Sequence, residues 1–148
     1  MAEVHIEPAR AELVPEFVAA LRTPDVYECW RLANQGPSDC LLESIAMSRL
    51  AFAGWIGGEP AAMWGLARPT PLGGTFGVPW LLSCTGVDRY PLTFARESRR
   101  WVAQLRAIEP NLCNFIDPAY ARAIRWVRWL GFDVEERDGG LVVFGTGR

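Results

Sequence analysis

The sequence predicts a single α/β domain (α+β in its mix of elements) whose mixed, mostly antiparallel sheet carries helices on both faces. Segments with strand and helix periodicity follow one another through all 148 residues, without a linker, an internal repeat or a low-complexity tract. The final segments, residues 111–144, are typical of a strand, a helix and a hairpin that close the domain. A chain of this length buries enough surface to be stable without disulfides or metals, so we expect one domain over residues 1–148.

The first third of the chain predicts one strand and three helices. Residues 4–7 alternate in hydropathy like a strand, and residues 12–22 carry apolar side chains at helical spacing. Residues 25–33 form a second short helix, which the sequence Asn-Gln-Gly-Pro at 34–37 ends. Ser38 is then expected to cap a third helix.

The middle of the chain predicts a hairpin, a buried strand and a long helix. Residues 51–56 and 61–66 are strand-like and flank the turn Gly-Gly-Glu-Pro at 57–60. After a loop rich in Pro and Gly at 68–77, the apolar run 78–85 indicates a central strand buried on both faces. Residues 91–108 place apolar side chains on one side and arginines on the other, which predicts an amphipathic helix.

The last third predicts the closing unit. Residues 111–116 indicate a strand, after which Asp117 is expected to cap a helix whose first residue is Pro118. That helix has an apolar stripe that includes Tyr120 and Val127, and Gly131 is placed to end it. Residues 132–136 and 141–144 then form a hairpin around Asp-Gly-Gly.

The composition excludes several classes of protein. The formal net charge is −2 and the pI about 5.4, so no overall basic field attracts nucleic acid or an acidic membrane. The N-terminus lacks the basic and apolar regions of a signal peptide, and no apolar run is long enough to span a bilayer, so we expect a cytoplasmic protein. The four cysteines are scattered and there is a single histidine, which argues against a metal site.

The motif AIRWVRWLGF at 123–132 comes after the predicted strand at 111–116 and before the hairpin. It resembles the last motif of the GNAT (Gcn5-related N-acetyltransferase) family, in which the pattern A-I-x-x-Y-x-x-x-G-F is common. The preceding order of hairpin, buried strand and long helix fits this family over nearly the whole chain. The resemblance implies a GNAT-like domain that transfers an acetyl group from acetyl-CoA to an amine.

A narrower resemblance rests on four short patterns: WLL at 80–82, R-x-x-R at 96–99, N-L-x-N at 111–114 and I-R-W at 124–126. Together they are similar to small GNAT-like internal virion proteins of short-tailed phages. This resemblance implies a bacteriophage protein that lies in the host cytoplasm or the virion. It also implies a partner, either another virion component or further copies of the chain.

Two departures from the GNAT pattern bear on chemistry. GNAT enzymes hold the cofactor's pyrophosphate on backbone N–H groups of a glycine-rich loop that follows the central strand. The equivalent cofactor-binding residues here would be Cys84, Thr85, Gly86, Val87 and Arg89. The stretch 85–91 has one glycine, an aspartate that repels phosphate and, at Pro91, a residue that lacks a donor; Arg89 would compensate in part. The tyrosine that protonates the leaving thiolate in many members is replaced by valine, which cannot transfer a proton.

Glu28 is the candidate catalytic residue. Asp25 and Glu28 are three residues apart and so lie on one face of a short helix. The corresponding region of GNAT-like folds borders the acceptor cleft, so Glu28 becomes a general base for an amine if burial raises its pKa. The alternative is a solvated acidic face that pairs with nearby arginines. Cys84 is a candidate nucleophile as well, although a buried structural thiol is the simpler interpretation.

The last predicted helix has a second face that carries Arg122, Arg125, Trp126 and Trp129. Exposed tryptophans among arginines are enriched in protein–protein interfaces, and a nucleic acid would be a weaker alternative. The rings could instead fold under the hairpin and leave the arginines solvated. Three functions therefore stay open: a phage protein with degenerate acyltransferase activity, an active N-acetyltransferase, and a non-catalytic docking protein. A splay between the central strand and the next one would favour a cofactor.

Overall fold

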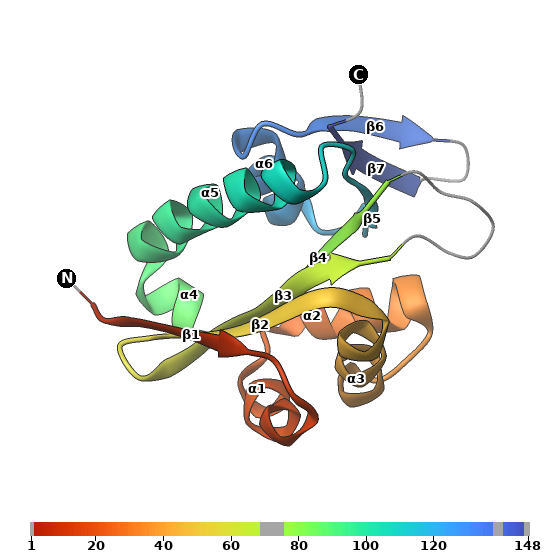
Figure 1. The fold of residues 1–148 in the computed structure, drawn as a ribbon. Helices are drawn as coiled ribbons and strands as arrows, with labels where there is room; N and C mark the ends of the chain where they lie inside the picture. The colour runs from red at the N-terminus through yellow and green to blue at the C-terminus, as the bar shows by residue number, and fades with distance from the viewer. Residues whose placement is uncertain (1, 69–75, 138–140, 147–148) are drawn as a thin grey trace.

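The computed structural model describes residues 2–68, 76–137 and 141–146 of the chain. Its strands form two sheets (Figure 1). The first sheet has the antiparallel order β1-β2-β3-β4, with β1 Val4–Pro8, β2 Ser48–Ile56, β3 Glu59–Ala67 and β4 Val78–Ser83. The second has the antiparallel order β5-β7-β6, with β5 Cys113–Ile116, β6 Asp133–Arg137 and β7 Leu141–Gly145. A parallel bridge between Gly77 and Leu112 joins them.

The helices lie on opposite faces of this divided sheet (Figure 1). One face carries η1 Ala11–Leu13, α1 Val14–Ala20, α2 Thr23–Glu28, the π-helical η2 Cys29–Ala33 and α3 Pro37–Met47. The other face carries α5 Pro91–Ile108 and α6 Ala121–Trp129, and the short α4 Gly86–Arg89 connects β4 to α5. The predicted α/β fold class with helices on both faces is therefore confirmed, while the sheet is split between β4 and β5.

Side chains of β3 explain how the sheet holds both layers. Met63 belongs to the core under α1 and α3, together with Phe17 and Leu41. Leu66 belongs to the core under α5 and α6, together with Leu105. Residues of odd and even number point to opposite faces of a strand, so β3 is buried from both sides. Both helix layers are thus fixed to the same strand.

Two predicted helix starts are wrong. The helix α3 begins at Pro37 after Gly36, and no side chain caps it, so Ser38 lies inside its first turn. The helix α6 begins only at Ala121. Asp117 instead accepts a hydrogen bond from the N–H of Ala119 at 3.0 Å, which forms a turn before the helix.

Other local predictions are confirmed. The long helix has the expected bounds, 91–108. Gly131 adopts a φ of +97° after α6, a conformation that favours glycine at a helix end. Most of the predicted loop at 68–77, and the Asp-Gly-Gly turn at 138–140, lie outside the described residues.

Candidate functional site

The two sheets separate along the edge of β4 that faces β5. Near the start of β4, the side-chain amide of Asn114 donates to the carbonyl oxygen of Pro79 at 2.7 Å. Near its end, the N–H of Arg22 donates to the carbonyl oxygen of Ser83 at 3.0 Å. Between these points no ladder joins β4 to β5 in the part of the chain that the structure describes. This opening, called the gap below, is the splay that would favour a cofactor.

The backbone of Leu81 faces the gap. On the β3 side, the N–H of Cys84 donates to the carbonyl oxygen of Ala61 at 2.8 Å. On the opposite side, Ser83 and Pro79 make the contacts just described. Because backbone groups alternate in direction along a strand, the N–H and C=O of Leu81 point the same way as those of Ser83. Leu81 therefore offers one donor and one acceptor to a ligand in the gap.

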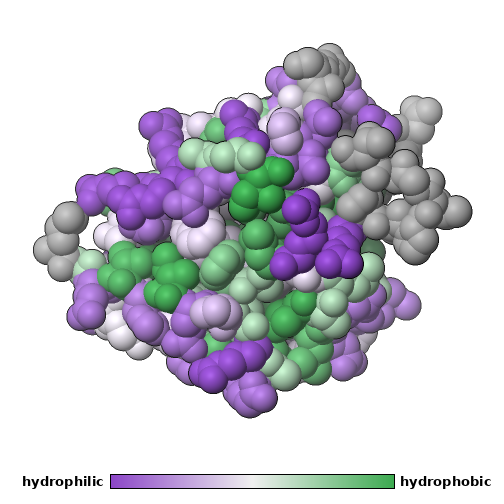
Figure 2. Space-filling view, viewed as in Figure 1, coloured by the Kyte–Doolittle hydropathy of each residue, from purple (hydrophilic) through white to green (hydrophobic). Residues whose placement is uncertain are grey.

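A cavity of about 550 Å³ adjoins the gap. Its wall takes Phe94 and Trp101 from α5 on one face of the sheet, and Glu28 and Cys40 from α2 and α3 on the other. Figure 2 shows hydrophobic surface between the hydrophilic side chains of α5 and the strands below them. A mainly apolar cavity of this volume with a few polar groups is typical of a small-molecule site.

Glu28, the predicted catalytic residue, lies in this wall at the end of α2. Burial raises the pKa of its carboxyl group to about 7. The N–H of Asp117, which donates to Oε2 at 3.2 Å, opposes the rise, and the carboxylates of Asp25 and Asp117 add to it. A carboxyl group with this pKa is ionised for much of the time at neutral pH and still basic enough to accept a proton.

Asp25 is buried one helical turn before Glu28, with 2% of its surface exposed. Ser83 donates to its carboxylate through the backbone N–H at 3.1 Å and the hydroxyl at 2.8 Å, and the hydroxyl of Tyr120 donates at 3.0 Å. Burial raises the pKa of Asp25 while these donors oppose the rise. The alternative of a solvated acidic face is therefore wrong for Asp25, because β4 and Tyr120 cover it.

Sequence reasoning missed Tyr120 as a member of this cluster, since the residue also fits the apolar stripe of the last helix. Burial raises the pKa of its hydroxyl to about 12, and the nearby Asp25 carboxylate adds to the rise. The proton therefore stays on Tyr120 at neutral pH. The hydroxyl of a tyrosine in an otherwise apolar stripe was the signal that could have found it.

Arg22 connects the Asp25 cluster to the loop after β4. Its side chain is 14% exposed. Its Nη1 donates to the hydroxyl oxygens of Tyr120 at 3.2 Å and Ser83 at 3.4 Å, and its Nε lies 3.2 Å from Oδ2 of Asp88. Arg122 of α6 approaches the other oxygen of Asp88 at 3.3 Å. Four separate segments thus meet at the C-terminal end of β4.

Two residues predicted to bind the cofactor through their backbones already bond within the chain. The N–H of Thr85 donates to the carbonyl oxygen of Ala20 at 2.9 Å, and that of Val87 to Cys84 at 3.1 Å. These amides are consequently not aimed at a ligand in this conformation. Cofactor binding by this loop stays a prediction.

Gly86 and Arg89 hold the same loop against the start of β3. A Cβ atom on Gly86 would lie 2.4 Å from the carbonyl oxygen of Pro60, so the close approach of the two backbones requires glycine. Arg89 pairs with Glu59 at 2.7 Å in an exposed position. Both contacts are structural, and Arg89 is turned toward Glu59.

Cys84 is fully buried at the end of β4. Its thiol donates to the carbonyl oxygen of Phe17 at 3.4 Å. Burial raises the pKa of this thiol to about 12, and the nearby carboxylates add to the rise. The thiolate that nucleophilic catalysis requires is therefore disfavoured, which supports the interpretation of Cys84 as a structural thiol.

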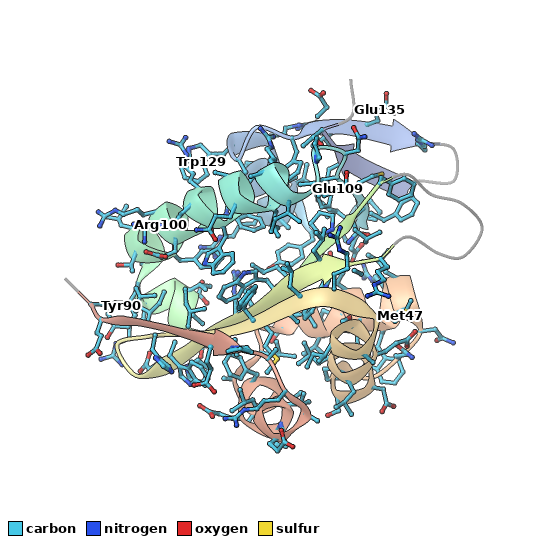
Figure 3. The ribbon with its side chains drawn as sticks, in the orientation of Figure 1. Met47, Tyr90, Arg100, Glu109, Trp129 and Glu135 are labelled. Atoms are coloured by element: carbon cyan, nitrogen blue, oxygen red, sulfur yellow. The ribbon has the colours of Figure 1, made fainter. Side chains whose placement is uncertain are left out.

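The two tryptophans of the predicted docking face occupy different environments. Trp126 stacks on Phe94 of α5 with ring centroids 5.7 Å apart, and its buried indole nitrogen has no hydrogen-bond partner among the residues that the structure describes. Trp129 is 46% exposed, and the guanidinium of Arg99 lies 3.9 Å from its ring centroid. Figure 3 shows Trp129 beside α5. Trp126 thus packs inside, because α5 covers it, and only Trp129 of the pair is available to a partner.

The arginines of that face also differ. Arg122 is held by Asp88, whereas Arg125 lies exposed on α6. Within residues 2–68, 76–137 and 141–146, no group of three or more His, Cys, Asp or Glu side chains could hold a metal ion. No helix in those ranges has the length and hydropathy needed to cross a membrane.

No protein-family profile matches the sequence, and no curated protein matches it. The fold, in contrast, is similar to solved acetyltransferases. The GNAT domain of S. lividans PAT superposes with a TM-score of 0.64 at 20% identity, over 97% of this chain and 89% of that one. The PaiA N-acetyltransferase of Thermoplasma acidophilum, solved with coenzyme A, gives 0.63 at 11% identity and 99% of both chains.

A third similar structure is the aminoglycoside acetyltransferase AAC(6')-Ib in complex with coenzyme A. It superposes with a TM-score of 0.65 at 16% identity, over 97% of this chain and 93% of that one. Each of these structures is matched over nearly its whole length, so the likeness covers nearly all of both chains rather than one motif. The chain therefore has the GNAT acetyltransferase fold.

Proposed function

We propose that this protein is an acyl-CoA-dependent N-acyltransferase that uses Glu28 as its general base. The observation that carries the proposal is the gap between β4 and β5, which adjoins a cavity with Glu28 in its wall. Two of the similar structures described above contain coenzyme A, which supports the same kind of donor here. A fold alone hosts many activities, so the function is inferred from these residues and not from the fold.

The residues around the gap fit the pantetheine arm of such a donor. The arm is a chain with two amide groups. The backbone of Leu81 offers one donor and one acceptor along an open strand edge, so the amides of the arm would bond to this edge as an added strand does. The loop after β4 fits the diphosphate less well, because the amides of Thr85 and Val87 are bonded internally. Acetyl-CoA would supply the activated acyl group.

Glu28 performs the proton step on the acceptor. An amine that enters the cavity from the α2–α3 side carries a proton that must leave before nitrogen can attack a carbonyl carbon. The Glu28 carboxylate accepts this proton, and its pKa of about 7 is suited to the exchange. Val127, at the place of the family's acidic tyrosine, is buried and has no proton to give. The C–S bond then breaks as the amide bond forms, and the leaving thiolate takes up, through solvent, the second proton that the nitrogen loses, so the proposed mechanism relies on base catalysis.

An acetyl-transfer assay tests this function. Purified protein is mixed with acetyl-CoA and a panel of primary amines, and the release of free thiol is followed. The proposal predicts amine-dependent thiol release that falls about a hundredfold in Glu28→Gln, a typical contribution of a general base. Thiol release that is the same with and without amine, or the same in Glu28→Gln, would contradict it.

A second candidate function, docking to a virion component or to another copy of the chain, follows from one observation. Trp129 is an exposed ring covered in part by Arg99, and such pairs are enriched in interfaces. The resemblance to phage internal proteins motivates this candidate. Trp129→Ser should then abolish self-association in light scattering or incorporation into particles. Unchanged assembly, with Trp126 left in place to preserve the core, would remove the docking role.

A further inference from the structure

Asp88 is an internal anion held between two arginines. Its carboxylate oxygens lie 3.2 Å from Nε of Arg22 and 3.3 Å from Nη1 of Arg122. The three residues come from the chain before α2, from α4 and from α6. The contact therefore joins distant parts of the sequence at the C-terminal end of β4, where the gap ends.

The two arginines are placed to bind an anion other than Asp88. Both line the cavity. The side chain of Arg22 is 14% exposed, and its Nη1 is already directed at Ser83 and Tyr120, so the direction of its guanidinium is fixed. Arg122 is 60% exposed and Asp88 is 45% exposed, so these two side chains can separate without disturbing the core.

We infer that Asp88 occupies, as an internal substitute, the site at which Arg22 and Arg122 bind the diphosphate of a nucleotide-derived cofactor. The inference rests on the proposed function, because the diphosphate belongs to the same acyl donor. In the free protein the arginines hold Asp88. When the donor binds, they exchange one carboxylate for a diphosphate, and Asp88 turns toward solvent.

The exchange is favoured by charge and geometry. A diphosphate carries more negative charge than a carboxylate and presents more acceptor oxygens, and arginine binds phosphate through paired N–H groups. The backbone amides of Thr85 and Val87, which bond within the chain, do not provide the usual cradle. Two guanidinium groups supply the missing positive charge. Asp88 then acts as a competitor that lowers the affinity for weakly charged or truncated ligands.

Removal of the competitor tests the inference. Binding of inorganic pyrophosphate and of coenzyme A is measured by isothermal titration at low ionic strength for the wild type, Asp88→Asn and Asp88→Ser. Both variants should bind pyrophosphate and coenzyme A about tenfold more tightly, because an arginine freed from Asp88 can make one further charge-assisted hydrogen bond to the ligand. Adding Arg122→Gln to Asp88→Asn should return the affinity to that of the wild type.

Two controls exclude simpler explanations. Arg128→Gln in the Asp88→Asn background removes an exposed arginine of α6 that is not paired with Asp88, and it should keep the gain. Circular dichroism melts of each variant verify that the fold is intact, and the Asp88→Ser variant provides a second measurement if Asp88→Asn is poorly folded.

The outcomes separate this inference from the proposed function. Equal or weaker pyrophosphate binding in both Asp88 variants, or a gain that survives Arg122→Gln, overturns the inference. A wild type that binds coenzyme A while the Asp88 variants bind it no better also overturns it and leaves the proposed function intact. Tighter pyrophosphate binding without any binding of coenzyme A would instead support the arginine site and overturn the proposed acyl donor.

Discussion

The hydroxyl of Tyr120 donates to the carboxylate of Asp25 at 3.0 Å, from the residue before α6 to the helix α2 on the other face of the sheet. Ser83 at the end of β4 bonds the same carboxylate. These contacts cross the region where no strand ladder holds the two sheets together. A buried polar cluster thus replaces backbone pairing at the end of the gap.

Tyr120→Phe should destabilise the fold by about 1–3 kcal/mol, because the buried Asp25 carboxylate loses a donor. Urea unfolding measures the free-energy difference. The control is Tyr27→Phe, whose ring is 58% exposed and whose loss of a hydroxyl should change stability by less than about 0.5 kcal/mol. Equal stabilities of the two variants would show that the Tyr120–Asp25 contact contributes nothing.

The pH dependence of activity should follow the ionisation of the Glu28 carboxyl group. A general base works only when ionised, so kcat/KM should rise with pH through about 7 and level off above it. In Glu28→Gln the rise should vanish along with most of the activity. Glu43→Gln, which removes an exposed carboxylate from the same cavity wall, should keep the wild-type profile. A profile that persists in Glu28→Gln would assign the base elsewhere.

The same residue should make stability depend on pH. The pKa of Glu28 is raised from 4.5 to about 7 on folding, so its neutral form is the one that the fold favours. Its contribution is fully present below pH 4.5 and is lost as the pH rises through 7. Glu28→Gln mimics the neutral form and should be more stable than the wild type at pH 8, by up to about 3 kcal/mol, but not at pH 4. Denaturant unfolding at both values measures this, and a constant difference would contradict the raised pKa.

Leu81→Pro separates ligand binding from folding. The N–H that it removes faces the gap and not β3, so the β3–β4 ladder should survive. Affinity for acetyl-CoA should fall about tenfold through the loss of one backbone donor, with the melting temperature nearly unchanged. Leu82→Pro is the matched control, since its N–H points to β3 and its loss should destabilise the sheet. Unchanged affinity in Leu81→Pro would place the ligand elsewhere.

Much of the fold could be predicted from periodicity. The long amphipathic helix at 91–108 and the glycine at 131 carry local signals that tertiary contacts did not override. The start of α6 could not be predicted in this way. Asp117 and Pro118 form a strong local cap signal, but the Asp117 carboxylate pairs with Arg31, 86 residues away, and the helix begins later.

The candidate site was predicted in part. Spacing alone placed Asp25 and Glu28 on one helical face, but only the packing of β4 and Tyr120 decides that the face is buried. The contacts of Arg22 with Asp88, and of Trp126 with Phe94, join segments far apart in sequence. No local pattern carries that information, so the sequence alone could not decide whether Trp126 is exposed or packed inside.

Isothermal titration of the wild-type protein with acetyl-CoA tests the central claim most directly. If the gap between β4 and β5 receives the acyl donor, acetyl-CoA should bind with a dissociation constant in the micromolar range, about the usual range of enzyme substrates. The same titration with Leu81→Pro should show weaker binding. The absence of binding at millimolar acetyl-CoA would contradict the proposed function.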